Sequence, residues 1–153
     1  MTKTEKILTL AQTIADERPH FFEKKGAGVG DKDTNSFMAE LRLRTQQALG
    51  GDFSERQICG NNNLSVDYFI PDENSIIEVA LSLRNPNTEY ERDLLKAIMA
   101  KEQGEPVLKL VFLSKPGAIK RHQQPSSVAM KDWIFNNHGI EVVIKELINK
   151  HFR

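Results

Sequence analysis

Two acidic residues provide the first candidate for chemistry. Asp67 and Glu78 stand in two apolar segments that are separated by the four-residue loop 71–74. A loop of this length predicts a β-hairpin in which Ile70 faces Ser75, so that Asp67 lies directly opposite Glu78. Like charges on directly opposed residues are destabilising. We therefore expect a cation between the two carboxylates, and their oxygen donors suit a hard divalent ion such as Mg²⁺.

The strand that would hold Glu78 has an alternating pattern. Its first face is wholly aliphatic and suits a core, with Ile77, Val79, Leu81 and Leu83. The other face has small or acidic residues beside one isoleucine, namely Ile76, Glu78, Ala80 and Ser82. Because side chains alternate between the two faces of a strand, this second face could form the floor of a cleft.

Periodicity and breaker residues predict the remaining elements. We expect helices that begin near residue 4, span 37–49 with Asn35 or Ser36 as cap, span 89–103, and open at Ser126 or Ser127. We expect strands at 53–59, 64–70, 75–83, 107–113 and 140–144. The expected order is therefore α-α-β-β-β-α-β-α-β, which is typical of an α/β domain with a mixed sheet. Leu94, Leu95, Trp133 and Phe135 are expected in the core.

Length and composition indicate an ordinary globular chain. The 153 residues predict one domain over 1–153, with a core at about 36–146 and an N-terminal helix and glycine-rich loop over 1–34. The loop at 24–31 is expected to be a linker or mobile cover. Cys59 is the only cysteine, which excludes an internal disulfide. With no signal-peptide pattern and no apolar run near the roughly 18 residues of a membrane span, we expect a cytoplasmic protein.

The paired acids and the element order resemble the PD-(D/E)xK nuclease superfamily, which has the restriction-endonuclease-like fold with helices on both faces of a mixed sheet. The resemblance implies that Asp67 is the first motif acid, Glu78 the second and Glu40 the acid of the preceding helix. It further implies a Mg²⁺ site, with Mn²⁺ as a substitute, held by Asp67, Glu78 and the backbone carbonyl of Val79. The alternative for Glu40 is a surface pair with Arg44 at i+4.

The motif lysine is missing, because Ala80 stands at its position. Lys96 is the nearest candidate replacement, since Glu89, Asp93 and Lys96 follow one another at i, i+4 and i+7 and share one face of a helix. The alternative is that Lys96 belongs to a solvated stripe of charges. The candidate catalytic groups are therefore Asp67, Glu78, Glu40 and Lys96.

A basic cluster follows the strand at 107–113. Lys115, Lys120 and Arg121 would contact DNA phosphates without reading sequence, and the alternative is a solvated loop. Lys and Arg equal Asp and Glu at 21 each, which counts against a dedicated DNA-binding protein. His122 is a further candidate base with no partner evident in the sequence.

Three functions remain open at this stage. The first is a Mg²⁺-dependent nuclease that hydrolyses DNA phosphodiester bonds, with DNA as partner and a homodimer as a further possibility. The second is a catalytically silent domain of the same fold that binds nucleic acid or a protein partner, which Ala80 and the neutral charge favour. The third is a small α/β interaction domain whose acids are surface decoration.

Overall fold

The computed structural model describes residues 1–23 and 29–150, with the backbone alone for residues 29–31. The chain groups into two compact units. The first comprises Met1–Asp52 with Leu147–Arg153, and the second comprises Phe53–Glu146. The expected single domain stays a prediction. Residues 24–28, which form most of the expected glycine-rich linker, lie outside the described residues.

The first unit contains two helices, α1 (Lys3–Asp16) and α2 (Val29–Leu49), which pack on one another. A capping box starts α1: the Thr2 hydroxyl accepts a hydrogen bond from the Glu5 amide, and the Glu5 carboxylate accepts one from the Thr2 amide. The chain after the last strand returns to α1. There the Gln12 side chain makes two hydrogen bonds of 2.8 Å with the backbone of Ile148.

Helix α2 is longer than predicted. The sequence predicted a start at Phe37 with Asn35 or Ser36 as cap, but the helix begins at Val29. Both expected caps lie inside the helix, and the Ser36 hydroxyl instead accepts a hydrogen bond from Arg18 at 3.3 Å. Polar residues cost at most about 0.7 kcal/mol each inside a helix, so a tertiary contact can outweigh their preference for a cap.

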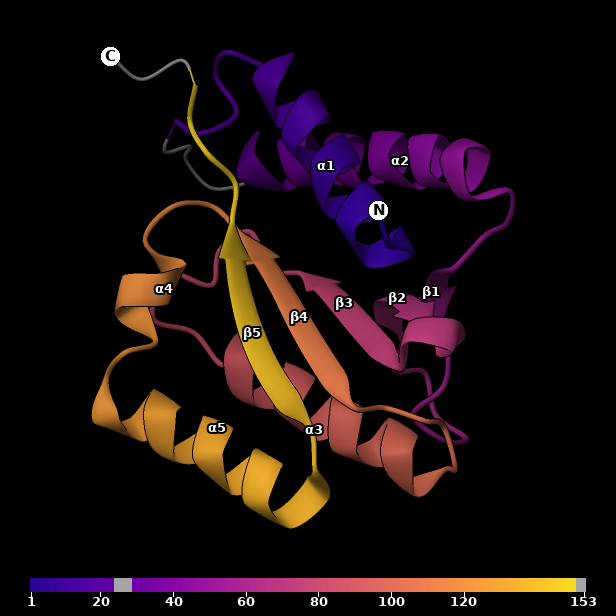
Figure 1. Cartoon of the computed structure of the whole chain (residues 1–153). Helices are drawn as coiled ribbons and strands as arrows, with labels where there is room; N and C mark the ends of the chain where they lie inside the picture. The colour runs from indigo at the N-terminus through magenta and orange to yellow at the C-terminus, as the bar shows by residue number, and fades with distance from the viewer. Residues whose placement is uncertain (24–28, 151–153) are drawn as a thin grey trace. The chain divides into compact units, whose positions relative to one another are not determined.

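The second unit holds a five-stranded mixed sheet in the order β1-β2-β3-β4-β5 (Figure 1). The first three strands pair antiparallel, whereas β3, β4 and β5 run parallel. Parallel neighbours need crossovers, which α3 supplies after β3, and α4 and α5 after β4. The elements are β1 (Ser54–Arg56), β2 (Val66–Ile70), η1 (Pro71–Glu73), β3 (Ser75–Val79), α3 (Glu89–Glu102), β4 (Lys109–Ser114), α4 (Ala118–Arg121), α5 (Pro125–His138) and β5 (Glu141–Glu146). The predicted α/β class with a mixed sheet is confirmed.

The hairpin of β2 and β3 has the predicted register. Phe69 pairs with Ile76, and Ile70 pairs with Ser75 across the turn. The turn is a single 3₁₀ turn, η1, closed by Asn74 with a positive φ of 54°. Such a left-handed residue lets the chain reverse within four residues.

Helices α3 and α5 lie on the same side of this sheet (Figure 1). The crossovers from β3 to β4 and from β4 to β5 step in one direction along the sheet, and crossovers of the same hand then place their helices on one face. The core on this face unites residues from strands and helices, among them Ile76, Ala80, Leu94, Ala97, Phe112 and Ile134. Helices on both faces stay a prediction, because these two helices cover one face only.

Three apolar residues expected in the core are exposed, and these predictions are wrong. Leu95 is 58% exposed, Trp133 54% and Phe135 57%. A helical period marks an apolar stripe, but the packing of the helix decides which side is buried. On α3 the buried side includes Asp93 and Lys96 instead. No helix within the described ranges is long and apolar enough to cross a membrane.

Candidate metal and phosphodiester site

Asp67 and Glu78 meet at the end of the hairpin through backbone amides. Glu78 Oε1 accepts a hydrogen bond from the Asp67 amide at 2.8 Å. Asp67 Oδ2 accepts one from the Val79 amide at 2.7 Å. Continuing the register of the hairpin by one pair places the two residues opposite each other, as predicted. Each carboxylate therefore has one oxygen anchored on the neighbouring strand, which fixes its orientation.

The cation beside Glu78 is Lys96, from α3. Its Nζ lies 2.5 Å from Glu78 Oε2 and 3.1 Å from Asp93 Oδ1, and it donates a hydrogen bond of 2.8 Å to the carbonyl of Ser65. The buried Glu78 Oε2 is therefore in direct contact with the ammonium, which partly neutralises its charge. Lys96 thus places a positive charge beside Glu78, whereas residue 80 of the strand segment is alanine.

The cluster extends from the interior to the surface. Glu78 is 2% exposed, Asp93 4% and Lys96 9%, so Lys96 is not part of a solvated stripe. Asp67 is half-buried, as is Glu89 at the start of α3. Glu89 accepts a hydrogen bond of 3.1 Å from the exposed Ser82. A ligand would therefore reach the buried pair from the side of Asp67 and Glu89.

Burial dominates the electrostatics of the cluster. Burial and then the negative charges of Asp93 and Asp67 raise the pKa of Glu78 to about 9, against the opposing effect of Lys96. For Lys96, burial opposes the charged form, but the carboxylates of Glu78 and Asp93 outweigh it and raise the pKa of the ammonium. Both groups therefore hold their protons to a higher pH than isolated side chains. With all three carboxylates ionised, Glu78, Asp93 and Asp67 exceed the single charge of Lys96 by two, so the cluster favours the binding of a proton or of a divalent cation.

The donor chemistry fits magnesium through two carboxylates. Magnesium commonly binds one or two protein carboxylates and keeps several waters. Asp67 and Glu78 are the residues that would hold it, because one oxygen of each carboxylate is oriented by a backbone amide of the opposite strand, although Glu78 Oε2 is in contact with Lys96. Among the side chains that the structure describes, no three His, Cys, Asp or Glu residues are arranged to hold a metal. A role for the Val79 carbonyl stays a prediction.

Glu40 lies in α2, in the first unit. Its Oε1 is 2.7 Å from Nε of Arg44, which is the i+4 pair that the sequence offered as the alternative. Arg44 also binds both carboxylate oxygens of Glu17, at 2.7 and 3.1 Å. The membership of Glu40 in the site stays a prediction.

The predicted basic residues follow the carboxyl end of β4. Lys120 is exposed and Arg121 half-buried in α4, and Lys115 is half-buried before it. Glu78 is the penultimate residue of β3, which runs parallel to β4, so the acidic cluster and the basic residues follow the same ends of these strands. Arg84 also lies here, since a β-carbon at Gly117 would be 3.5 Å from its Cβ.

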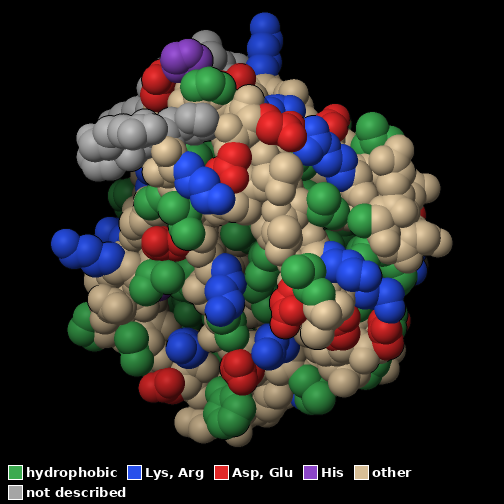
Figure 2. Space-filling model, turned by 45° about the horizontal axis from the view of Figure 1, so that its top comes forward, with side chains coloured by type: hydrophobic (Ala, Val, Ile, Leu, Met, Phe, Trp, Pro, Cys, Tyr) green, Lys and Arg blue, Asp and Glu red, His purple; other side chains and the backbone are tan. Residues whose placement is uncertain are grey.

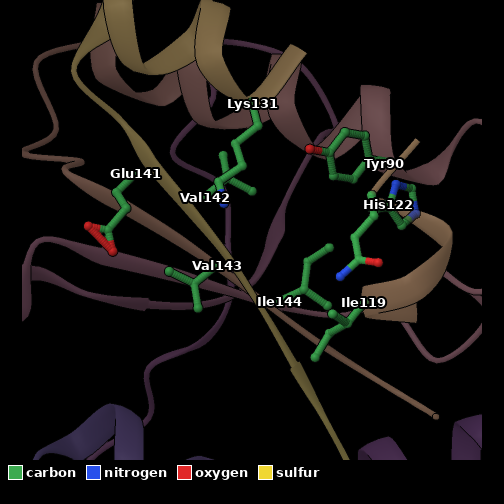
Figure 3. A pocket seen from close by; sticks show the side chains of 9 residues that line it. Tyr90, Ile119, His122, Lys131, Glu141, Val142, Val143 and Ile144 are labelled. Carbon is green, nitrogen blue, oxygen red and sulfur yellow. The ribbon is translucent and has the colours of Figure 1, made fainter. Parts of the chain in front are cut away.

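His122 has a structural environment rather than that of a free base. Its Nε2 is 3.0 Å from the carbonyl of Leu83, so this nitrogen is the donor, and its Nδ1 is 2.9 Å from the hydroxyl of Ser127. The ring also stacks on Tyr90 with centroids 4.3 Å apart. Figure 3 shows His122 and Tyr90 together at one end of a surface cavity.

Sequence reasoning placed Asp93 on the face of Lys96 but did not assign it to the site. The i, i+3 spacing of Asp93 and Lys96 was the available signal. The contact of Lys96 with the carbonyl of Ser65 could not be predicted from the sequence, because every residue type has a backbone carbonyl. Searches of the chain against protein-family models, curated proteins and solved structures found no match.

Proposed function

We propose that the second unit hydrolyses DNA phosphodiester bonds with Mg²⁺, and that Asp67, Glu78 and Lys96 form its site. The supporting observation is the position of Lys96, whose ammonium reaches Glu78 at 2.5 Å although the strand has alanine at the motif position. The resemblance to PD-(D/E)xK nucleases calls for two acids and a lysine in one place. These three side chains supply that set from two strands and one helix.

Asp67 and Glu78 would hold the metal, with Mn²⁺ as a possible substitute. When bound, the ion would lower the pKa of an attacking water and offset charge on the phosphate oxygens. The anchored oxygens of Asp67 and Glu78 keep both carboxylates oriented without reorganisation. Lys96 would supply a fixed positive charge in a site where burial strengthens electrostatic interactions.

DNA would be held by Lys115, Lys120 and Arg121. Lysine and arginine contacts to phosphate give affinity and position but carry no sequence information. The location of these residues after β4, a neighbour of the strand of Glu78, supports this assignment. The proposal thus comprises a restriction-endonuclease-like topology, a nuclease activity and DNA as partner.

The second candidate is a catalytically silent domain that binds nucleic acid or a protein. One observation favours it: the cluster already contains its own cation, because Lys96 contacts both Glu78 and Asp93. In that case the ion pair has a structural role and holds α3 against the hairpin.

Metal binding is the first test. Calorimetric titration with Mg²⁺ and Mn²⁺ should show binding to the wild-type protein and its loss in Asp67→Asn and Glu78→Gln. The matched controls are Asp72→Asn in the same hairpin and Glu91→Gln on the exposed side of α3. If the wild-type protein binds no metal, or binds it no better than Asp67→Asn, the proposed site is refuted.

Cleavage separates the two candidates. Single-stranded, duplex and branched DNA would be incubated with the protein and Mn²⁺, and the products separated by electrophoresis. We expect cleavage that falls at least about 100-fold in Asp67→Asn and in Lys96→Met, and that persists in Asp72→Asn. Metal binding without cleavage of any substrate supports the silent domain.

A further inference from the structure

The edge strand β5 is flanked by α4 at its end, where Glu146 Oε2 accepts hydrogen bonds from the amides of Gly117 and Ile119, and the rest of its outer edge faces no other strand of the described residues. β5 is the last strand in the sheet order and, among the described residues, pairs with β4 alone. The amide of Glu141 donates to the carbonyl of Leu108 on the β4 side, so the backbone groups of Val142 and Ile144 point away from the sheet. An unpaired edge with outward amides is a template for another strand.

A surface trough follows this edge. Two cavities of about 380 and 410 Å³ share Lys131, Glu141 and Val142. Four consecutive residues, Glu141 to Ile144, line the first cavity although their side chains alternate between the two faces. The cavity therefore runs along the strand edge, with Lys131 of α5 above it and Glu141 and Val143 on the other side of the strand (Figure 3).

The residues of β5 are complementary to a second β5 in reverse direction. If two copies pair antiparallel about Val143, Glu141 of each copy faces Lys145 of the other, and Val142 faces Ile144. Opposite charges across an antiparallel pair stabilise it, and this one forms twice. A shift by two residues, the nearest that keeps outward backbone groups paired, would remove both Glu141–Lys145 pairs. Within one chain, the ion pair of Glu141 among the described residues is a long, exposed contact of 3.8 Å with Lys109.

The exposed side of α5 is also complementary to a second copy of itself in the reverse direction. Val128, Lys131, Asp132 and Phe135 lie at i, i+3, i+4 and i+7, so they share one side of the helix. All four are exposed, including Val128 at 39% and Phe135 at 57%. In an antiparallel contact centred between Lys131 and Asp132, each of these charges faces its opposite, and Val128 faces Phe135.

Val143, the centre of the strand pair, and the point between Lys131 and Asp132, the centre of the helix pair, lie at similar distances from the turn that joins α5 to β5. α5 and β5 run in opposite directions on either side of the left-handed Gly139. From His138 back to the point between Lys131 and Asp132 is about 10 Å of helix. From Ile140 forward to Val143 is about 10 Å of strand. A single two-fold axis can therefore satisfy both contacts, as an isologous interface requires.

We propose that a second copy of this chain binds along β5 and α5, giving a two-fold dimer with one continuous sheet. The dimer is independent of the proposed nuclease activity. No residue of this interface belongs to the Asp67–Glu78–Lys96 cluster, so a failure of either proposal leaves the other standing.

Charge reversal tests the register. Sedimentation velocity over a concentration series should give twice the chain mass for the wild-type protein. Glu141→Lys places two lysines opposite each other and Lys145→Glu places two glutamates opposite each other, so each variant should return to the mass of one chain. The double variant Glu141→Lys/Lys145→Glu should recover the dimer. An equimolar mixture of the two single variants should also dimerise, because both pairs are then opposite in charge.

Glu102→Lys, on the exposed end of α3, is the matched control and should remain dimeric. Circular dichroism would verify that each variant is folded. The proposal is overturned if the wild-type chain stays monomeric throughout the concentration series. Binding of an extended peptide along β5 by a monomeric chain would also overturn it, because the edge would then have a different partner. It is also overturned if Glu141→Lys leaves the dimer intact, or if the mixture of single variants stays monomeric.

Discussion

Lys96 and Glu78 show how two residues far apart in sequence can form one buried ion pair. The strand position that would place a lysine beside the acids holds Ala80, and the ammonium arrives from α3 instead. The side chain of Lys96 is long enough to reach across the core face to the hairpin and bind the carbonyl of Ser65. A positive charge therefore lies beside Glu78 although residue 80 is alanine.

Removing the ammonium should be costly. Lys96→Met leaves Asp93 and Glu78 without their counter-charge, and loss of one partner of a buried pair costs about 3–5 kcal/mol of the free energy of unfolding. We expect a loss of about 3 kcal/mol, because Glu78 can remain protonated and then leaves no unpaired charge of its own. Urea denaturation of Lys96→Met, Glu78→Gln and the double variant would measure it. The double variant should lose less than the sum of the two singles, and simple additivity would contradict the coupling.

Glu78 should also make stability depend on pH in the metal-free protein. Its pKa is raised in the folded state from the usual 4.5 to about 9, so the folded state holds more protons in this range. The stability that the protonated form contributes is complete below about pH 4.5 and is lost as the pH rises towards 9. In the presence of a chelator, the free energy of unfolding of the wild-type protein should fall across this window relative to Glu78→Gln. Parallel pH profiles of the two proteins would contradict the expectation.

At the level of elements, the hairpin of β2 and β3 positions both acids. Its register depends on a turn of four residues in which Asn74 has a positive φ. The carbonyl of Asn74 also accepts hydrogen bonds from the amides of Leu108 and Lys109, at 2.8 and 3.1 Å. The same turn therefore sets the register of the hairpin and holds the start of β4.

Asn74 offers a direct test of this turn. Asn74→Ala should lower the free energy of unfolding by about 1 kcal/mol, because a left-handed conformation disfavours a β-carbon without a polar side chain. Asn74→Gly should be close to the wild-type protein, since glycine adopts positive φ without strain. Thermal or urea denaturation of both variants would decide. Equal losses for alanine and glycine would show that the side chain, not the backbone angle, matters.

For the molecule as a whole, the formal charges balance. Lys and Arg equal Asp and Glu at 21 each, and the face in Figure 2 shows acidic and basic side chains side by side. Affinity for a polyanion must then come from a local group of basic residues rather than from net charge. The residues that follow β4 are the proposed group.

The salt dependence of DNA binding would measure that group. Lys120→Ala/Arg121→Ala should weaken binding to all sequences alike and reduce the slope of log affinity against log salt by about 1 for each lost phosphate contact. Fluorescence anisotropy at several salt concentrations gives both quantities. Lys6→Ala/Arg56→Ala, which removes two exposed charges elsewhere, should leave the slope unchanged. Equal effects of the two double variants would exclude a localised contact.

The sequence by itself determined the hairpin that holds Asp67 and Glu78. Its register follows from the loop length and from strand alternation, which are local properties, and the pairs of Phe69 with Ile76 and of Ile70 with Ser75 confirm it. The α/β class followed in the same way from the order of apolar periods. The start of α2 did not, because caps such as Asn35 compete with tertiary contacts.

The tertiary structure decided which sides of the helices are buried. Helical spacing puts Asp93 and Lys96 on one side of α3 and Leu95 about 160° away from Asp93, but it cannot tell which side meets the sheet. Packing of α3 against the strands buries Asp93 and Lys96 and leaves Leu95 exposed. The reason is that burial depends on long-range docking, whereas register and element type depend on residues close together in the chain.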